Sequence, residues 1–168
     1  MISGHLLGWS IAAVLLFWGV GAYNRLVRLR SEALRAFTLL EPKLQRFTEH
    51  VVAAAPLPAD VQGAATQFAA SLAVARIKPL DAEAMAALGA ACAVLQMAWR
   101  RAAEAADTAD TVSGPQPWAD IYREAGMAAR EFTASVLAYN AAVTQFPAAL
   151  LAWLFGFRKA QPLALPPA

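Results

Sequence analysis

The sequence predicts an all-α protein in which an N-terminal transmembrane helix continues into an antiparallel four-helix bundle. Hydrophobic residues make up 59% of the 168 residues, and much of the excess over a usual soluble domain is alanine, a strong helix former. An uncharged apolar stretch occupies residues 6–23, and four later segments repeat apolar residues at intervals of three and four. The length fits one domain with a short anchor.

The predicted anchor reads LLGWSIAAVLLFWGVGAY over residues 6–23. A membrane-spanning helix needs about 20 apolar residues, and Met1 and Ile2 extend the stretch to that length. Trp9 and Trp18 lie towards its two ends, where amphipathic rings favour the headgroup region. We therefore expect a transmembrane anchor over residues 1–23.

The charges beside the anchor predict its orientation. Arg25, Arg28, Arg30 and Arg35 follow it, whereas no Lys or Arg precedes it. Positive flanks stay in the cytoplasm, so we expect a single pass with the N-terminus outside and the bundle cytoplasmic. The alternative is a signal peptide cleaved near residues 20–22, which would release a periplasmic bundle, although signal peptides begin with a positive region that this chain lacks.

The bundle is expected over residues 24–146. Its first helix continues the anchor, is kinked at Pro42 and ends before residues 56–58, which hold two prolines. The second helix is capped by Asp60 and ends near residue 78, and the third is capped by Asp81. The fourth runs from about Trp118 to Gln145. The apolar faces expected to form the core of the first, third and fourth helices are Leu26, Leu29, Ala33, Ala36, Leu40, Leu44, Phe47 and Val51; Met85, Leu88, Cys92, Leu95, Trp99, Ala102 and Ala106; and Ile121, Ala125, Ala128, Phe132, Val136, Tyr139, Val143 and Phe146.

The tail, residues 147–168, begins with the apolar sequence PAALLAWLFGF. Four antiparallel helices bring the chain back to the membrane, and this stretch is too short to cross it. We expect it to lie in the membrane interface, with aromatic rings among the headgroups and a basic pair on lipid phosphates. The residues involved are Trp153, Phe155, Phe157, Arg158 and Lys159. A compatible alternative is that the tail folds back over the open end of the bundle.

The residues that usually carry chemistry are sparse. The chain has two histidines and one cysteine, and it contains no His-Glu-x-x-His sequence, no nucleophile elbow and no phosphate-binding glycine loop. We expect no catalytic, cofactor-binding or metal-binding residues, and we place Glu49 and His50 on a solvated helix face. Nucleic-acid binding is not expected, because the net charge is only +2 and no basic stripe is present.

Two Tyr-Asn pairs mark the membrane end of the bundle. Tyr23 and Asn24 follow the anchor, and Tyr139 and Asn140 lie near the end of the fourth helix, before Phe146 and Pro147. In an antiparallel bundle the two pairs come close together. We expect each Asn amide to satisfy a buried backbone group or Tyr hydroxyl, which is a structural role. The alternative is a notch for a small ligand or a partner.

The two ends of the sequence resemble the LemA family. The C-terminal stretch YNAAVTQFPAALLAWLFGFRKA is similar to that family's C-terminal signature, and YNRLVRLRSEALRAF is similar to its membrane-exit segment. The positions that match are Tyr139, Asn140, Phe146, Pro147, Gly156, Phe157, Arg130 and Val136, and Tyr23, Asn24, Leu26, Val27, Arg30, Ala36, Glu41, Leu44 and Arg46. A second Tyr-Asn pair, usual in the family six residues before Tyr139, is replaced by Thr133-Ala134, so the chain resembles a divergent member.

The resemblance implies a non-catalytic scaffold or adaptor in the cell inner membrane that mediates protein–protein interaction. In this interpretation the bundle surface and the loop at residues 108–118 contact unidentified membrane or cytoplasmic proteins, and the apolar tail contacts membrane lipid. The alanine-rich helix faces allow close approach, so we also expect contact with further copies of the chain. The alternative is an accessory or regulatory subunit of a membrane enzyme such as an envelope protease.

Overall fold

The structure is a computed structural model that describes residues 2–54, 56–105 and 118–165, with side chains from residue 8 onward. Its helices are α1 (Ile2–Ala53), α2 (Ala59–Ile77), α3 (Ala82–Ala105), α4 (Trp118–Thr144) and α5 (Ala148–Leu154). Helices are the only regular secondary structure in these ranges, which confirms the predicted all-α class. The expected loop at residues 108–118 lies outside the described residues apart from Trp118, which begins α4.

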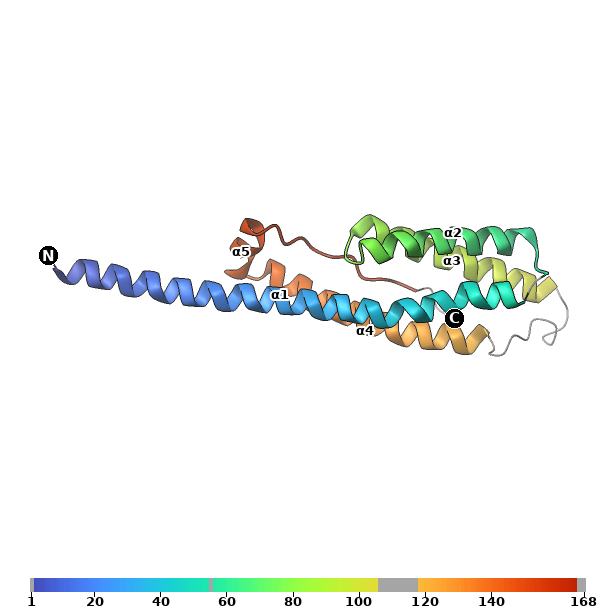
Figure 1. The fold of residues 1–168 in the computed structure, drawn as a ribbon, viewed down its shortest axis with the longest axis horizontal. Helices are drawn as coiled ribbons and strands as arrows, with labels where there is room; N and C mark the ends of the chain where they lie inside the picture. Colours follow the sequence, from blue (N-terminus) through green and yellow to red (C-terminus); the bar gives the residue numbers. More distant parts are fainter. Residues whose placement is uncertain (1, 55, 106–117, 166–168) are drawn as a thin grey trace.

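Helix α1 is continuous over 52 residues and projects far beyond the other helices (Figure 1). At 1.5 Å per residue it is about 78 Å long. Pro42 lies inside α1 and does not end it. Leu40 and Leu44, on either side of the proline, are fully buried, so packing holds the helix together where one backbone donor is missing.

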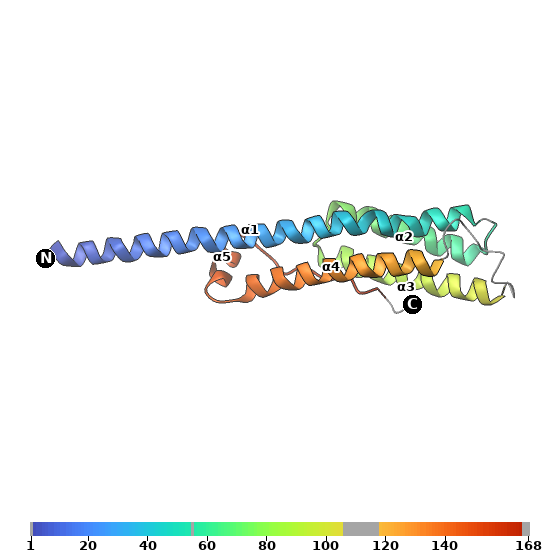
Figure 2. The same ribbon diagram turned by 90° about the horizontal axis from the view of Figure 1, so that it is seen from below.

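Helices α1 to α4 lie alongside one another, with successive helices running in opposite directions (Figures 1 and 2). Helix α1 packs along both α4 and α2, α2 packs along α3, and α5 contacts α1 and α4. The described backbones of α3 and α4 make no direct contact. The helices therefore form an open series, α4–α1–α2–α3, in which one side is left for another part of the chain.

The core lies between the helices and follows the predicted apolar faces, of which Ala106 lies outside the described residues. Edge-to-face pairs join α1 to its neighbours: the ring centroids of Phe37 and Phe132 are 5.7 Å apart, and those of Phe47 and Phe68 are 5.8 Å apart. One predicted core residue is wrong, because the Phe146 side chain is 77% exposed. Phe146 follows the end of α4 and no longer shares that helix's inward face.

The two predicted N-caps have different outcomes. The Asp81 cap is confirmed, since its carboxylate accepts a hydrogen bond from the Ala84 backbone N–H at 3.0 Å. The Asp60 cap is wrong, because Pro58 occupies the N-cap position and no side chain caps α2. Asp60 lies instead within the first turn, where its negative charge interacts favourably with the positive end of the helix dipole.

Two described helices are long and apolar enough to cross a membrane. They are α1 from Gly8 onward, in which an 18-residue window has mean hydropathy 1.4, and α3, in which such a window has mean hydropathy 1.3. Helices α4 and α5 also pass together but are bent by 95°. Half of the apolar window of α3 is buried against the protein, compared with 6% of that of α1. The predicted long apolar N-terminal helix is thus confirmed, and α1 could be a membrane span.

Candidate functional site

The candidate site is the neck, defined as the region where the apolar part of α1 meets the end of α4, α5 and the segment after α5. A tight turn reverses the chain beyond α5. Gly156 has φ +70°, the Phe157 N–H donates to the Ala152 carbonyl at 2.8 Å, and the Gly156 N–H donates to the Trp153 carbonyl at 3.3 Å. This is a Schellman motif, and the left-handed backbone at Gly156 suits a residue without a Cβ.

Residues 157–165, here called the strap, then run back along the bundle as an extended segment (Figure 1). The Asn140 side chain forms two hydrogen bonds with the Ala160 backbone, both 2.8 Å long. The Tyr139 hydroxyl donates to the Arg158 carbonyl at 2.9 Å, and the Thr133 hydroxyl donates to the Leu163 carbonyl at 3.2 Å. Three side chains of α4 thus hold the strap at fixed points.

The strap lies on the side of the bundle where the backbones of α3 and α4 stay apart. Its Leu163 and Ala160 side chains are buried. A Cβ built on Gly89 of α3 would lie 3.4 Å from the Ala164 carbonyl oxygen, so the strap reaches α3 as well as α4. The tail does fold back, as one expectation held, but residues 157–165 cover the side of the bundle rather than its open end.

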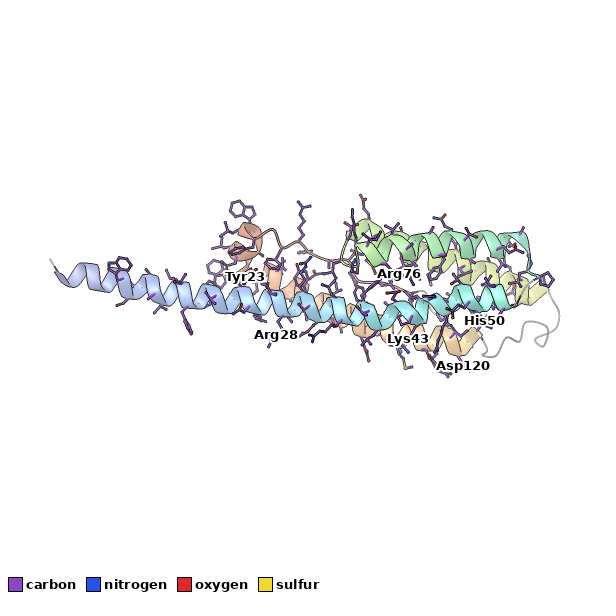
Figure 3. The ribbon with its side chains drawn as sticks, viewed as in Figure 1. Tyr23, Arg28, Lys43, His50, Arg76 and Asp120 are labelled. Carbon is purple, nitrogen blue, oxygen red and sulfur yellow. The ribbon has the colours of Figure 1, made fainter. Side chains whose placement is uncertain are left out.

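The tyrosines of the two Tyr-Asn pairs line one cavity at the neck, and three of the four residues contact the C-terminal segment. Tyr23 contacts Phe155 and Phe157, with ring centroids 4.9 and 5.9 Å away, and Figure 3 places Tyr23 where α1 meets α5. Tyr139 and Asn140 hold the strap from α4. The Asn24 side chain is exposed and has no hydrogen bond to any described residue. The expected satisfaction of a backbone group therefore holds for Asn140 and does not hold for Asn24.

The residues between α4 and α5 bend the chain at the neck. The Phe146–Pro147 peptide bond is cis, and Pro147 occupies the N-cap position of α5. Phe146 and Pro147 line a cavity of about 400 Å³ together with Phe17, Trp18 and Arg25 of α1. These two residues therefore lie at the neck, as expected, and face the apolar part of α1.

The predicted interface residues lie on α5 and the beginning of the strap. Trp153 is 83% exposed and Phe155 is 56% exposed, Arg158 and Lys159 are also exposed, and Phe157 is half-buried. Leu150 and Leu154 are exposed as well. Large apolar side chains are therefore presented outward at the same level as Tyr23, where α1 changes from an exposed apolar helix to a packed one.

His50 is buried, which overturns its placement on a solvated face. Only 4% of the residue is exposed, and its ring lies 5.1 Å from that of Trp99 and 5.8 Å from that of Trp118. Its Nε2 atom is buried without a hydrogen-bond partner among the described residues. Burial lowers the pKa of His50 because the charged form loses its hydration. Its neighbour Glu49 remains exposed, where it accepts a hydrogen bond from the Gln45 side chain.

An aromatic cluster surrounds His50 at the end of the bundle far from the N-terminus (Figure 3). Trp99 of α3 and Trp118 of α4 are stacked, with ring centroids 4.5 Å apart and planes 15° apart. Phe47 and Tyr122 extend the cluster into the core. The sequence signal for this cluster was weak, because Trp118 follows a polar loop and His50 follows a charged residue. Stacking between helices distant in the sequence leaves no local pattern.

Buried titratable groups elsewhere are held in their neutral forms. Burial raises the pKa of the Cys92 thiol to about 12, and burial, followed by the field of Cys92, raises the pKa of Tyr122. Burial also raises the pKa of Tyr139, while the charge of Arg30 opposes that rise. A thiol with so high a pKa is a poor nucleophile at neutral pH, so Cys92 is a core residue, as its apolar sequence context indicated.

Ion pairs join the helices on the bundle surface. Glu124 of α4 lies 2.7 Å from Arg46 and 3.7 Å from Lys43, both on α1. Arg76 of α2 lies 2.7 Å from Glu41 of α1. These side chains are all partly exposed, so each pair contributes modestly to stability, about 0–1 kcal/mol, and mainly fixes the register of neighbouring helices.

No group of three or more His, Cys, Asp or Glu side chains that could hold a metal ion occurs in the described residues. The groups present at the neck are aromatic rings, side chains hydrogen bonded to the backbone and exposed basic residues. Comparisons with family models, with curated proteins and with solved structures found no match to the chain.

Proposed function

We propose that the chain is a non-catalytic, membrane-anchored scaffold or adaptor of the LemA type that mediates protein–protein interaction at the membrane. The observation that carries the proposal is the division of α1 into two halves. The large side chains between Trp9 and Val20 are exposed, for example Phe17 at 85%. From Leu26 onward the same helix buries a face against α4 and α2.

An apolar helix surface of this size is costly in water and stable in lipid. Residues 2–23 form about 33 Å of helix, which matches a hydrocarbon core of about 30 Å. In the proposed arrangement α1 carries the antiparallel four-helix bundle out of the bilayer on the cytoplasmic side of the cell inner membrane. The arginines that follow the anchor support that orientation.

The tail supports the same placement. Trp153 and Phe155 are exposed on and beside α5, at the level of Tyr23. Aromatic rings are stable at the membrane interface, where one end of the ring system is in an apolar environment and the other is hydrated. We propose that α5 rests in the interface beside α1, with Arg158 and Lys159 facing lipid phosphates.

The outer face of α3 is the proposed contact surface for proteins. Ala86, Ala90, Val94 and Met97 recur along it at helical spacing, all are exposed, and none is charged. Small side chains allow another helix to approach closely, and contiguous exposed apolar surface is typical of interaction sites. Another protein or a second copy of this chain is the proposed occupant.

The proposal is tested by site-specific crosslinking in intact cells. A photoreactive residue at Val94 examines the outer face of α3, the same residue at Gln67 of α2 is a matched control on an exposed polar surface, and one at Trp153 examines the tail. We expect a discrete protein adduct at Val94, none at Gln67 and lipid adducts at Trp153. The absence of any protein adduct at Val94 would remove the support for a scaffold. If the adduct proves to be a membrane enzyme whose activity changes without this chain, the accessory-subunit alternative is favoured.

A further inference from the structure

A second cavity at the neck, of about 740 Å³, gathers positive charge from three separate parts of the chain. Arg30 comes from α1, Lys78 from the turn between α2 and α3, and Arg158 and Lys159 from the strap. These cations come from distant parts of the sequence, and they line one cavity because α2 packs back along α1 and the strap folds back beside both. Tyr23, Phe155 and Phe157 form the wall of the cavity nearest the anchor.

None of the four cations has an acidic partner among the described residues. The ion pairs of α1 and α2 use Arg28, Arg46 and Arg76 instead. Asp81 is the one carboxylate that lines the cavity in the described part of the chain, and its Oδ1 atom is already bonded to the Ala84 N–H. The lining residues therefore carry three more positive than negative charges, and like charges held together are stabilised by an anion.

The depth of the cavity relative to the anchor suggests where that anion comes from. Arg30 lies seven residues beyond Tyr23 on α1, which is about 10 Å along the helix axis. The headgroup region extends roughly 5–8 Å beyond the hydrocarbon core on each side. With Tyr23 at the edge of the hydrocarbon, the cavity extends from the headgroup region to just beyond it, so the Arg30 backbone lies within a side-chain length of the lipid phosphates.

We propose that this cavity binds the phosphate group of an anionic ligand, and that the depth of the cavity favours an anionic phospholipid headgroup as the source. Arg30 and Arg158 present planar guanidinium groups that bind phosphate oxygens in pairs, and Lys78 and Lys159 add point charge. The assignment of a lipid source rests on the proposed membrane anchoring. The phosphate site itself rests only on the cavity and its charges.

Lipid selectivity of the full chain in vesicles tests the proposal. Spin-labelled phosphatidylglycerol and spin-labelled phosphatidylcholine are compared in phosphatidylcholine vesicles, and the motionally restricted fraction of each gives their relative association constant. We expect roughly fivefold preference for phosphatidylglycerol at low salt, reduced towards one in 1 M salt because the charges are screened. The double variant Arg30→Gln/Lys78→Gln should lose most of this preference.

The matched control is Arg28→Gln/Arg35→Gln. It removes the same number of charges from the flanks of Arg30 on α1, and neither residue lines the cavity. The control should keep the preference. If both double variants lose it equally, general attraction to an anionic surface explains the selectivity and the site is overturned. Unchanged circular dichroism of each variant shows that the fold is intact, as expected since all four side chains are exposed.

Two further measurements test membrane anchoring and phosphate binding independently of lipid selectivity. Flotation of the full chain with phosphatidylcholine vesicles reports anchoring alone, and its failure contradicts the proposed function. Calorimetric titration of the detergent-solubilised chain with inorganic phosphate examines the site without any bilayer. Suppose that the full chain binds phosphate through Arg30 and Lys78, but not through Arg28 and Arg35, and still shows no lipid selectivity. That combination of results would assign the cavity to a free phosphate compound. No dependence on Arg30 and Lys78 in either measurement overturns the proposal.

Discussion

The side-chain amide of Asn140 is hydrogen bonded to Ala160 in both directions, with its Nδ2 donating to the Ala160 carbonyl and its Oδ1 accepting from the Ala160 N–H. Both bonds are 2.8 Å long. These are the two backbone hydrogen bonds that a neighbouring β-strand would form with Ala160, although no strand lies beside the strap in the described part of the chain. Asn140 therefore satisfies both backbone groups of a buried residue in an extended segment, and this fixes the register of the strap on α4.

We expect Asn140→Ala to lower the free energy of unfolding by about 1–3 kcal/mol, because two half-buried backbone groups of Ala160 lose their partners. Thermal unfolding of the full chain in detergent measures the change. Amide hydrogen exchange at Ala160 should become faster at the same time. Asn24→Ala, which removes an exposed amide with no described hydrogen bond, is the control and should change neither. Unchanged stability of Asn140→Ala together with lost partner binding would favour the notch alternative.

Alanine substitution should affect stability differently at the two phenylalanines of the predicted α4 face. Phe132 is fully buried against Phe37, whereas Phe146 is 77% exposed. Phe132→Ala should cost about 3–5 kcal/mol, since it removes buried area and leaves a cavity. Phe146→Ala should change the detergent-state stability by less than about 0.5 kcal/mol. Denaturant unfolding followed by circular dichroism measures both, and equal losses would contradict the packing described for the end of α4.

His50 should make stability depend on pH. Burial holds its folded pKa below the ordinary value of 6.5, so below pH 6.5 the unfolded chain binds a proton that the folded chain resists. Stability should therefore fall as pH is lowered through 6.5 towards the folded pKa, and His50 should contribute no slope above that window. Melting temperatures between pH 8 and pH 5 measure this. His50→Phe should flatten the slope, and because His5 is present in both proteins, the difference isolates His50.

Cys92 should react with thiol reagents only when α3 opens. The thiol is 2% exposed and its pKa is raised to about 12, so both access and thiolate formation are suppressed in the folded protein. Maleimide labelling at pH 8 should be slow and should accelerate at denaturant concentrations that unfold the bundle. A control chain with Cys92→Ala and Ala90→Cys, which moves the thiol to the exposed face of α3, should label rapidly without denaturant. Fast labelling of the native Cys92 would show that α3 is not packed as described.

Local patterns made most of the helices predictable. The apolar spacing of α3, from Met85 to Trp99, predicted a buried face that the structure confirms, and Asp81 was recognisable as a cap from its place before that pattern. Pro56 and Pro58 predicted the end of α1 because proline cannot continue a helix. Such signals lie within a few residues of one another, so a sequence displays them directly.

The features that depend on contacts between distant segments could not be read in the same way. The strap reaches α3 and α4 through Ala160 and Leu163, and nothing in the sequence of the tail indicates which groove accepts it. His50 is buried because two tryptophans from different helices stack beside it, which no spacing within α1 reveals. The cationic cavity likewise joins Arg30 to Lys78 across 48 positions of sequence, counting from 30 to 78.

The most direct test of the account compares two leucines of α1 whose side chains are exposed to a similar degree. Leu16 is 71% exposed and Leu39 is 63% exposed, but only Leu16 lies in the proposed membrane span. Nitroxide labels at Leu16→Cys or Leu39→Cys, in a Cys92→Ala background and with the full chain in vesicles, report collisions with oxygen and with a water-soluble nickel complex. The account predicts high oxygen and low nickel access at residue 16, and the reverse at residue 39. High nickel access at both positions would show that the exposed half of α1 lies in water, and would contradict the membrane-anchored scaffold.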